Sequence, residues 1–205
     1  MLIVLSPAKR LDFSEPPVAV EPTLPRLMED VASLARTAKR QTKADLRRLM
    51  GISDDLARLN RERFQAFDPE ATDGTPAAFA FAGDVYQGLD ARTLDSDALA
   101  FAQDRVRILS GLYGVLRPLD LILPYRLEMG TRLPSARGKD LYAFWGERIT
   151  ARLAEDAAAV RARALVNLAS DEYFRAVRPA ALPVPVVSPV FEDWKGDRFK
   201  VVSFW

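Results

Sequence analysis

LSGLYGVLRPLDLILPYRLEMG, residues Leu109–Gly130, is the stretch that decides the fold, because it cannot form one uninterrupted helix. Its glycines allow backbone conformations that a side chain would forbid. Its two prolines fix their own φ angles and push the preceding residues towards extended geometry. We therefore predict a short strand at Arg107–Leu109, a tight irregular connection, and then an extended run that can pair in a sheet.

The same segment carries polar side chains among aliphatic ones, and two interpretations of them stay open. A charged group that is buried without a partner is expensive, so these side chains must reach water, each other or a ligand. They could form an internal ion-pair network that fixes the turn. Alternatively they form a pocket wall for an anionic ligand, with Arg117 and Arg126 as forked donors. The polar set is Tyr113, Arg117, Asp120, Tyr125, Arg126 and Glu128.

The composition is that of one globular domain. The chain has 205 residues, of which 49% are hydrophobic and 28% charged, which is enough for one well-cored unit. No apolar run approaches the roughly 18 residues that a membrane helix needs. The N-terminal MLIVLSPAK lacks the basic lead of a signal peptide, so we expect a buried strand at Met1–Leu5 of a cytoplasmic protein that does not bind membranes.

The sequence contains no cysteine and no histidine. This excludes disulfides, catalysis by Ser-His or Cys-His pairs, and nearly every structural zinc or iron site. Any acid or base must be Asp, Glu, Lys or Tyr, and any metal would be a hard, oxygen-ligated cation. We expect no cofactor and no bound metal.

Charge is unevenly distributed along the chain. The window Arg36–Arg63 holds nine basic and four acidic residues, so it carries +5 and leaves −4 for the rest of a chain with net charge +1. A local basic patch on a nearly neutral protein indicates contact with a polyanion. A solvated helical face is the alternative explanation.

Within that window, residues 42–60 have the spacing of two short amphipathic helices joined by a hairpin. A glycine at the junction suits a left-handed helix cap, and the following serine suits the N-cap of the second helix. The pattern is typical of a helix-hairpin-helix element that holds a DNA phosphate on its backbone N–H groups. Asp54 and Asp55 argue against this, because they would repel a phosphate, and a plain helical hairpin is the alternative. The predicted DNA-binding residues are Lys43, Arg47, Arg48, Gly51, Ile52, Ser53 and Arg58.

The remaining segments predict a mixed α/β fold: a single compact domain with a central β-sheet and surrounding helices. A long helix is expected to begin near Leu141 and to end at 161–164, followed by an interior strand at 165–169. Ser170 then suits the N-cap of a further helix. An antiparallel hairpin is expected from strands at 184–191 and 198–204, joined by a turn at 195–197.

A second functional hypothesis places the scattered polar residues in one cleft, as an enzyme or a binder of a small anionic metabolite. Lys9 would act as a nucleophile or a phosphate-binding charge, and Asp84 or Glu128 would move protons. These three are the catalytic candidates, and no reaction is assigned. The predicted ligand-binding residues are Lys9, Asp84, Tyr86, Tyr113, Arg117, Tyr125, Arg126, Lys139 and Asp171.

Five motifs along the chain resemble the YaaA family of bacterial peroxide-stress proteins. They are SPAK at 6–9, FxGDVYxGL at 81–89, the segment 109–130, GKDLYxFWG at 138–146 and NLASDEYF at 167–174. The resemblance covers nearly the whole chain. It implies a single YaaA-like domain over residues 1–205, in a cytoplasmic protein that limits oxidative damage by lowering free intracellular iron.

The resemblance also implies a helix-hairpin-helix element and an affinity for double-stranded DNA, and we expect a monomer. Two departures matter. Without Cys or His, protection cannot run through thiol chemistry or a histidine-ligated iron site. Family members also continue past Trp205 through a basic segment, so the C-terminal part of the family pattern is expected to be missing here.

Overall fold

A five-stranded sheet forms the centre of the computed structural model, which describes residues 1–16, 20–196 and 198–201. Its strand order is β6-β5-β1-β8-β9. β1 lies parallel to both β5 and β8, β8 lies parallel to β9, and only β6 runs antiparallel, as the return of a hairpin with β5. The five strands are β1 (Leu2–Leu5), β5 (Val106–Ser110), β6 (Gly114–Leu116), β8 (Leu165–Asn167) and β9 (Val186–Val187).

Three small antiparallel pairs make up the other strands of the described residues. The bounds are β2 (Arg10–Leu11) with β4 (Phe81–Ala82), β3 (Thr75–Pro76) with β7 (Leu121–Ile122), and β10 (Glu192–Lys195) with β11 (Arg198–Val201).

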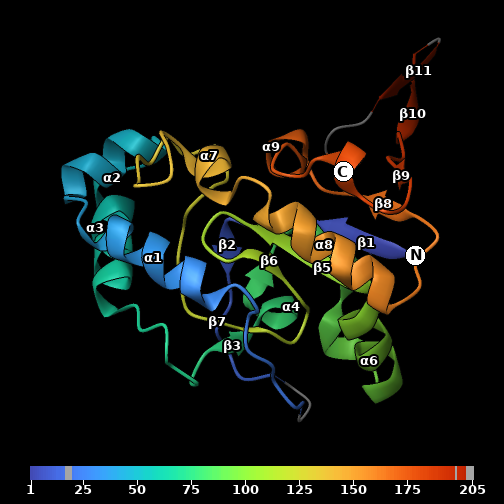
Figure 1. The fold of residues 1–205 in the computed structure, drawn as a ribbon, viewed down its shortest axis with the longest axis horizontal. Coiled ribbons are helices and arrows are strands. Elements are labelled where there is room, and N and C mark those ends of the chain that lie inside the picture. Colours follow the sequence, from blue (N-terminus) through green and yellow to red (C-terminus); the bar gives the residue numbers. More distant parts are fainter. Residues whose placement is uncertain (17–19, 197, 202–205) are drawn as a thin grey trace.

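Helices surround the sheet, and α8 lies across its front face in Figure 1. No described helix is both long and apolar enough to cross a membrane. The predicted mixed α/β fold, with a central sheet and surrounding helices, is confirmed. The helices are α1 (Met28–Lys39), α2 (Lys43–Met50), α3 (Asp54–Ala66), α4 (Ala77–Ala80), α5 (Asp84–Leu89), α6 (Ser96–Arg105), α7 (Leu141–Trp145), α8 (Arg148–Ala159) and α9 (Asp171–Phe174), with 3-10 turns at Ala91–Thr93 and Pro179–Ala181.

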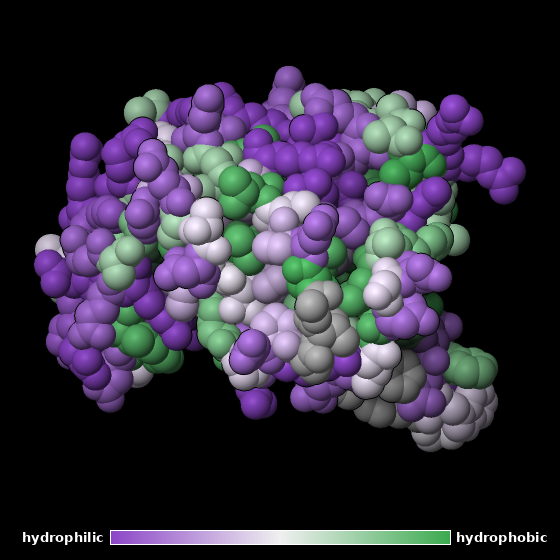
Figure 2. Space-filling model, turned by 90° about the horizontal axis from the view of Figure 1, so that it is seen from below, coloured by the Kyte–Doolittle hydropathy of each residue, from purple (hydrophilic) through white to green (hydrophobic). Residues whose placement is uncertain are grey.

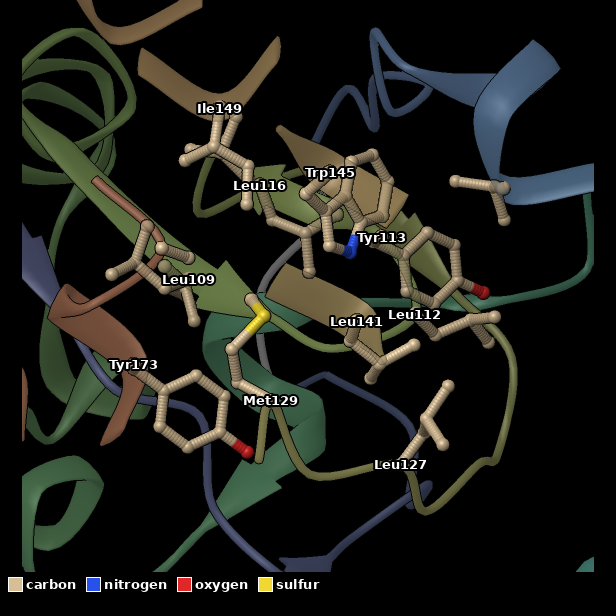
Figure 3. Packing of buried hydrophobic residues seen from close by; sticks show 14 of the residues in the cluster. Leu109, Leu112, Tyr113, Leu116, Leu127, Met129, Leu141, Trp145, Ile149 and Tyr173 are labelled. Carbon is tan, nitrogen blue, oxygen red and sulfur yellow. The ribbon is translucent and has the colours of Figure 1, made fainter. Parts of the chain in front are cut away.

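The segment 109–130 passes through the main hydrophobic core, as Figure 3 shows. Trp145 is fully buried against it, and its indole N–H donates to the carbonyl oxygen of Gly111 at 3.0 Å. Gly114 has a left-handed backbone with φ of 72°, and a Cβ there would lie 2.8 Å from the Trp145 ring. Gly114 is therefore needed both for backbone geometry and for close packing.

Several local predictions are corrected by the structure. The strand expected at Met1–Leu5 begins at Leu2, and the strand expected at 165–169 ends at Asn167. The strand predicted at Arg107–Leu109 extends one residue further at each end, as β5. The long helix expected from Leu141 is two helices, because Gly146 takes φ of 54° and ends α7 before α8 begins.

The predicted C-terminal hairpin exists with different strands. β11 pairs with β10, whereas the segment predicted at 184–191 contributes β9 to the central sheet beside β8. Pairing with β8 covers a strand edge that would otherwise lie open. Asp197 of the predicted turn and residues 202–204 of the predicted strand lie outside the described residues.

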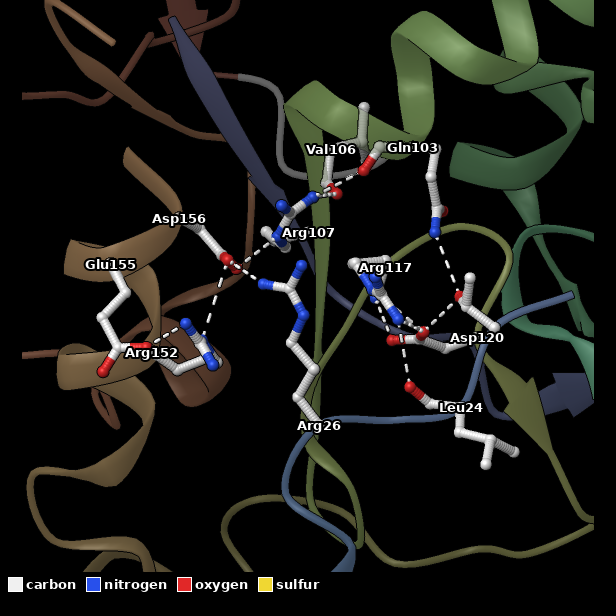
Figure 4. A network of polar contacts seen from close by, with 11 residues as sticks. Leu24, Arg26, Gln103, Val106, Arg107, Arg117, Asp120, Arg152, Glu155 and Asp156 are labelled. Atoms are coloured by element: carbon white, nitrogen blue, oxygen red, sulfur yellow. Dashed lines mark hydrogen bonds and ion pairs between the residues drawn. The ribbon is translucent and has the colours of Figure 1, made fainter. Parts of the chain in front are cut away.

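A buried ion-pair cluster joins the sheet to α8 (Figure 4). The carboxylate of Asp156, 2% exposed, accepts from Arg107 Nε at 2.6 Å and also pairs with Arg26. Arg152 Nε lies 3.7 Å away from the same carboxylate. Several donors therefore compensate one buried negative charge.

Candidate functional site

Two strand ends meet at Ser6, which follows β1. The Ser6 hydroxyl donates to Ser170 Oγ at 3.2 Å and accepts from the Ser170 backbone N–H at 2.9 Å. Tyr86 OH donates to the Ser6 carbonyl at 2.8 Å. Ser170 stands at the N-cap position of α9, but its side chain makes no capping bond, because it faces Ser6 instead. This edge lies at the carboxyl ends of parallel strands, where open α/β sheets carry their ligand sites.

Beside this edge, Lys9, Arg126 and Glu128 form a small charged cluster. Glu128 Oε1 lies 3.2 Å from Lys9 Nζ and 3.0 Å from Arg126 Nη2. Lys9 is largely exposed, whereas the Nε of Arg126 is buried and has no hydrogen-bond partner among the described residues. The adjoining cleft, which Tyr125 and Tyr173 also line, has a volume of about 20 Å³, which is room for about one water molecule.

The tyrosines near this cleft are hydrogen-bonded neutral groups. Tyr125 OH and Ser110 Oγ are 2.6 Å apart, and Tyr113 OH accepts from the Leu123 backbone N–H at 2.9 Å. Burial raises the pKa of Tyr113, Tyr125 and Tyr173 above the usual tyrosine value. These hydroxyls therefore stay protonated near neutral pH and position the chain rather than abstract protons.

Arg117 does not line this cleft. Its guanidinium donates to Asp120 Oδ1 at 2.7 Å and to the Leu24 carbonyl at 3.0 Å (Figure 4). Asp120 is 1% exposed and also accepts from Thr23 Oγ1 at 2.6 Å. Arg117 therefore belongs to an internal ion-pair network and not to a pocket wall for an anionic ligand.

The other predicted ligand residues lie around the same edge or beyond it. Asp84 and Asp171 are exposed at the first positions of α5 and α9. Lys139 lies in a separate and larger cavity of about 550 Å³, beside α7. The structure thus brings Lys9, Tyr125, Arg126 and Glu128 to one cleft, and places Arg117 and Lys139 elsewhere.

The basic window folds as two exposed helices joined at Gly51. Gly51 has φ of 61°, as expected for a left-handed C-cap, and Ser53 Oγ accepts from the Leu56 backbone N–H. A capping box between Thr42 and Asp45 begins α2. The helices occupy the left end of the molecule in Figure 1, and hydrophilic side chains predominate at that end in Figure 2.

All four predicted DNA-binding cations are paired with nearby carboxylates. Asp54 accepts from Lys43 and lies 3.6 Å from Arg47, and the Lys43 hydrogen bond holds the pKa of Asp54 below its usual range. Arg48 pairs with Asp45 at 2.8 Å. Arg58 likewise pairs with Glu62, at 3.1 Å. Within the described residues, five further cations of the window have no ion pair: Arg36, Lys39, Arg40, Arg61 and Arg63.

These ion pairs leave the hairpin accessible. Solvent screens exposed pairs, which therefore contribute little, so an incoming phosphate can replace the carboxylate. The hydrogen bonds of the described residues also leave the backbone N–H groups of Ser53, Asp54 and Asp55 unpaired at the N-terminus of α3. Such groups are donors for an anion.

Several residues of these sites were not predicted from the sequence. Ser6 and Tyr173 belong to the motifs SPAK and NLASDEYF, but only the fold shows that Ser6 contacts Ser170 beyond the end of β8. Arg132 and Arg175 line the larger cavity and lie outside every motif. A sequence signal for Arg175 is its place directly after the NLASDEYF motif, where it forms the C-cap of α9.

The comparisons agree over the whole chain. A family profile described as "Peroxide stress protein YaaA" matches residues 1–205. A UPF0246 protein of Phenylobacterium zucineum is 60% identical over 205 residues, covering all of this chain and 77% of the relative. UPF0246 proteins of Cupriavidus metallidurans and Caulobacter vibrioides are each 55% identical, covering all of this chain and 80% of the relative. The chain therefore belongs to the YaaA family of peroxide stress proteins.

Proposed function

We propose that the protein acts in peroxide stress by binding double-stranded DNA without sequence preference, through a helix-hairpin-helix element at α2 and α3. The exposed turn at Gly51 supports this, because three backbone N–H groups without a partner among the described residues lie there beside the cations of the window. Backbone donors and Lys or Arg side chains are the groups that hold DNA phosphates. No base-reading arrangement is needed for such contacts.

The negative charge of Asp54 opposes phosphate binding at this turn, but the same side chain holds two cations in position there. Its carboxylate lies at the N-terminus of α3, where a phosphate would bind, and already engages Lys43 and Arg47. A phosphate that displaces this carboxylate meets both cations in place. Asp54 thus occupies the site when no DNA is bound and weakens binding without preventing it.

The link to iron follows from the electrostatics of DNA. Duplex DNA holds a condensed layer of cations, and a protein that neutralises phosphates releases them. Ferrous ions in that layer would be released together with the others. We propose that the bound protein lowers the iron at the DNA surface, where reaction with peroxide would cut the strands.

Charge reversal in the hairpin tests DNA binding. We expect the variant K43E/R47E/R48E to bind duplex DNA at least tenfold more weakly at low salt, because three phosphate contacts are lost. The slope of log affinity against log salt should become shallower by about 2.7, or 0.9 for each contact. Fluorescence anisotropy with a labelled duplex measures both quantities, and an unchanged affinity would remove the basis of the proposal.

Two substitutions that each remove a negative charge should strengthen DNA binding, and they serve as controls for each other. D54N and D55N each remove one negative charge from the first turn of α3, but only Asp54 pairs with Lys43 and Arg47. D54N should therefore tighten DNA binding more than D55N does. Equal effects would mean that the paired cations do not contact the DNA.

A further inference from the structure

The largest cavity among those described shares no lining residue with the Lys9 cleft or with the hairpin. It has a volume of about 550 Å³, in the range of small-molecule pockets. The segment from Gly130 to Asp140 forms one wall, and residues of α7 and the end of α9 form the others. α7 and α9 lie next to each other along the top of Figure 1. The lining residues are Gly130, Arg132, Lys139, Asp140, Tyr142 and Arg175.

Three cations line this cavity without a compensating partner. In the described part of the chain, no carboxylate lies within ion-pair distance of Arg132, Lys139 or Arg175. The guanidinium of Arg175 lies 5.1 Å from the centroid of the Tyr142 ring, which orients it by a cation–π contact. Like charges gathered in this way repel one another, so their placement favours an anion between them.

The carboxylates near this cavity accept hydrogen bonds from backbone N–H groups. Asp140 Oδ1 accepts from the Ala143 backbone N–H at 2.8 Å, as the N-cap of α7. Glu172 Oε1 accepts from the Gly130 backbone N–H at 2.8 Å. These carboxylates hold the walls in place, and the cations remain available to a ligand.

The walls are also tied to each other. Tyr142 OH donates to the Glu172 carbonyl at 2.9 Å, which joins α7 to α9. The Leu141 backbone N–H donates to the Thr131 carbonyl at 3.4 Å. The cavity is thus bounded by hydrogen-bonded segments, and α9 directly follows the carboxyl end of β8, on the side of the sheet where ligands bind in open α/β folds.

We propose that this cavity binds a phosphate-bearing small molecule of nucleotide size. Two guanidinium groups provide the forked donors that match phosphate oxygens, and Lys139 adds a third charge. The volume exceeds what a single phosphate needs, so it leaves room for the remainder of a phosphate ester. The inference does not depend on the hairpin, because it rests on other residues and another ligand.

Calorimetric titration with ADP and with inorganic triphosphate tests the proposal. Both should bind the wild-type protein at low salt, and the variant R132Q/K139Q/R175Q should bind at least tenfold more weakly. The control R163Q/R198Q/K200Q removes three exposed charges elsewhere and should keep wild-type affinity within about twofold. Thermal melting checks that both variants fold, which we expect because the substituted side chains are exposed.

Three outcomes would overturn the proposal. One is no binding of either probe to the wild-type protein at millimolar concentration. Another is an equal loss of binding in the control, which would mean only general attraction to a basic surface. The third distinguishes a small phosphate ester from the phosphate backbone of DNA. It is a loss of affinity for duplex DNA in the variant R132Q/K139Q/R175Q, together with a failure of ADP to compete with DNA. That result would mean that the cavity holds a backbone phosphate of DNA. Failure of K43E/R47E/R48E to weaken DNA binding would leave the pocket proposal unaffected.

Discussion

Replacing Asp156 by alanine should lower the free energy of unfolding by about 3–5 kcal/mol, the cost of breaking a buried pair from one side. Arg107 is 4% exposed and donates to Asp156 from the middle of the central sheet. Without the carboxylate its charge would stay buried beside strand β1 with only carbonyl acceptors, those of Gln103 and Val106. Urea denaturation followed by circular dichroism measures the loss.

Glu155 is the matched control for this substitution. It precedes Asp156 on α8 and also pairs with Arg152, but its side chain is 63% exposed. E155A should change stability by less than about 1 kcal/mol, because exposed pairs contribute little. If D156A and E155A lose similar amounts, the cluster in Figure 4 does not hold α8 on the sheet.

Replacing Gly111 by alanine should destabilise the protein by about 3 kcal/mol, the upper range for an overpacked core. The added Cβ would lie 2.1 Å from the Leu127 carbonyl oxygen, which is backbone and cannot rotate away. The shift would also disturb the hydrogen bond from Trp145 to Gly111. The urea midpoint measures the effect.

Gly88 is the control for this substitution, because a Cβ there meets nothing within 4 Å. It lies in α5, where alanine is favoured over glycine by about 1 kcal/mol. G88A should therefore leave stability unchanged or raise it. A G111A protein as stable as the wild type would contradict the close approach of residues 111 and 127.

Local chemistry predicted the helix ends well, because it depends on a few neighbouring residues. Gly51 and Ser53 occupy the caps expected of them. The pairing of β9 with β8 could not be predicted, because it depends on which strand edge lies open after the sheet has formed. The break at Gly146 was hidden by apolar residues at four-residue spacing on both sides of it.

The candidate sites were predictable only in part, because they too depend on contacts between segments that are distant in the sequence. The charges along the sequence predict the basic window, but they do not reveal that Asp54 pairs with two of its cations. The motif residues near Lys9 do meet at one sheet edge, whereas Arg117 has an internal partner in Asp120. Arg132 and Arg175 face one cavity only because α9 packs beside α7, a contact that no sequence spacing reveals.

We propose that DNA binding through the hairpin protects DNA from iron and peroxide. The nicking of supercoiled plasmid by ferrous ion and hydrogen peroxide at low salt tests this protection. The nicking rate is measured with wild-type protein, with K43E/R47E/R48E, and with R163E/R198E/K200E. The last variant is the control, because it reverses three charges outside the hairpin. We expect the wild type and the last variant to slow nicking, and K43E/R47E/R48E to leave it at the rate without protein. If K43E/R47E/R48E protects the plasmid as well as the wild type does, the claim is contradicted.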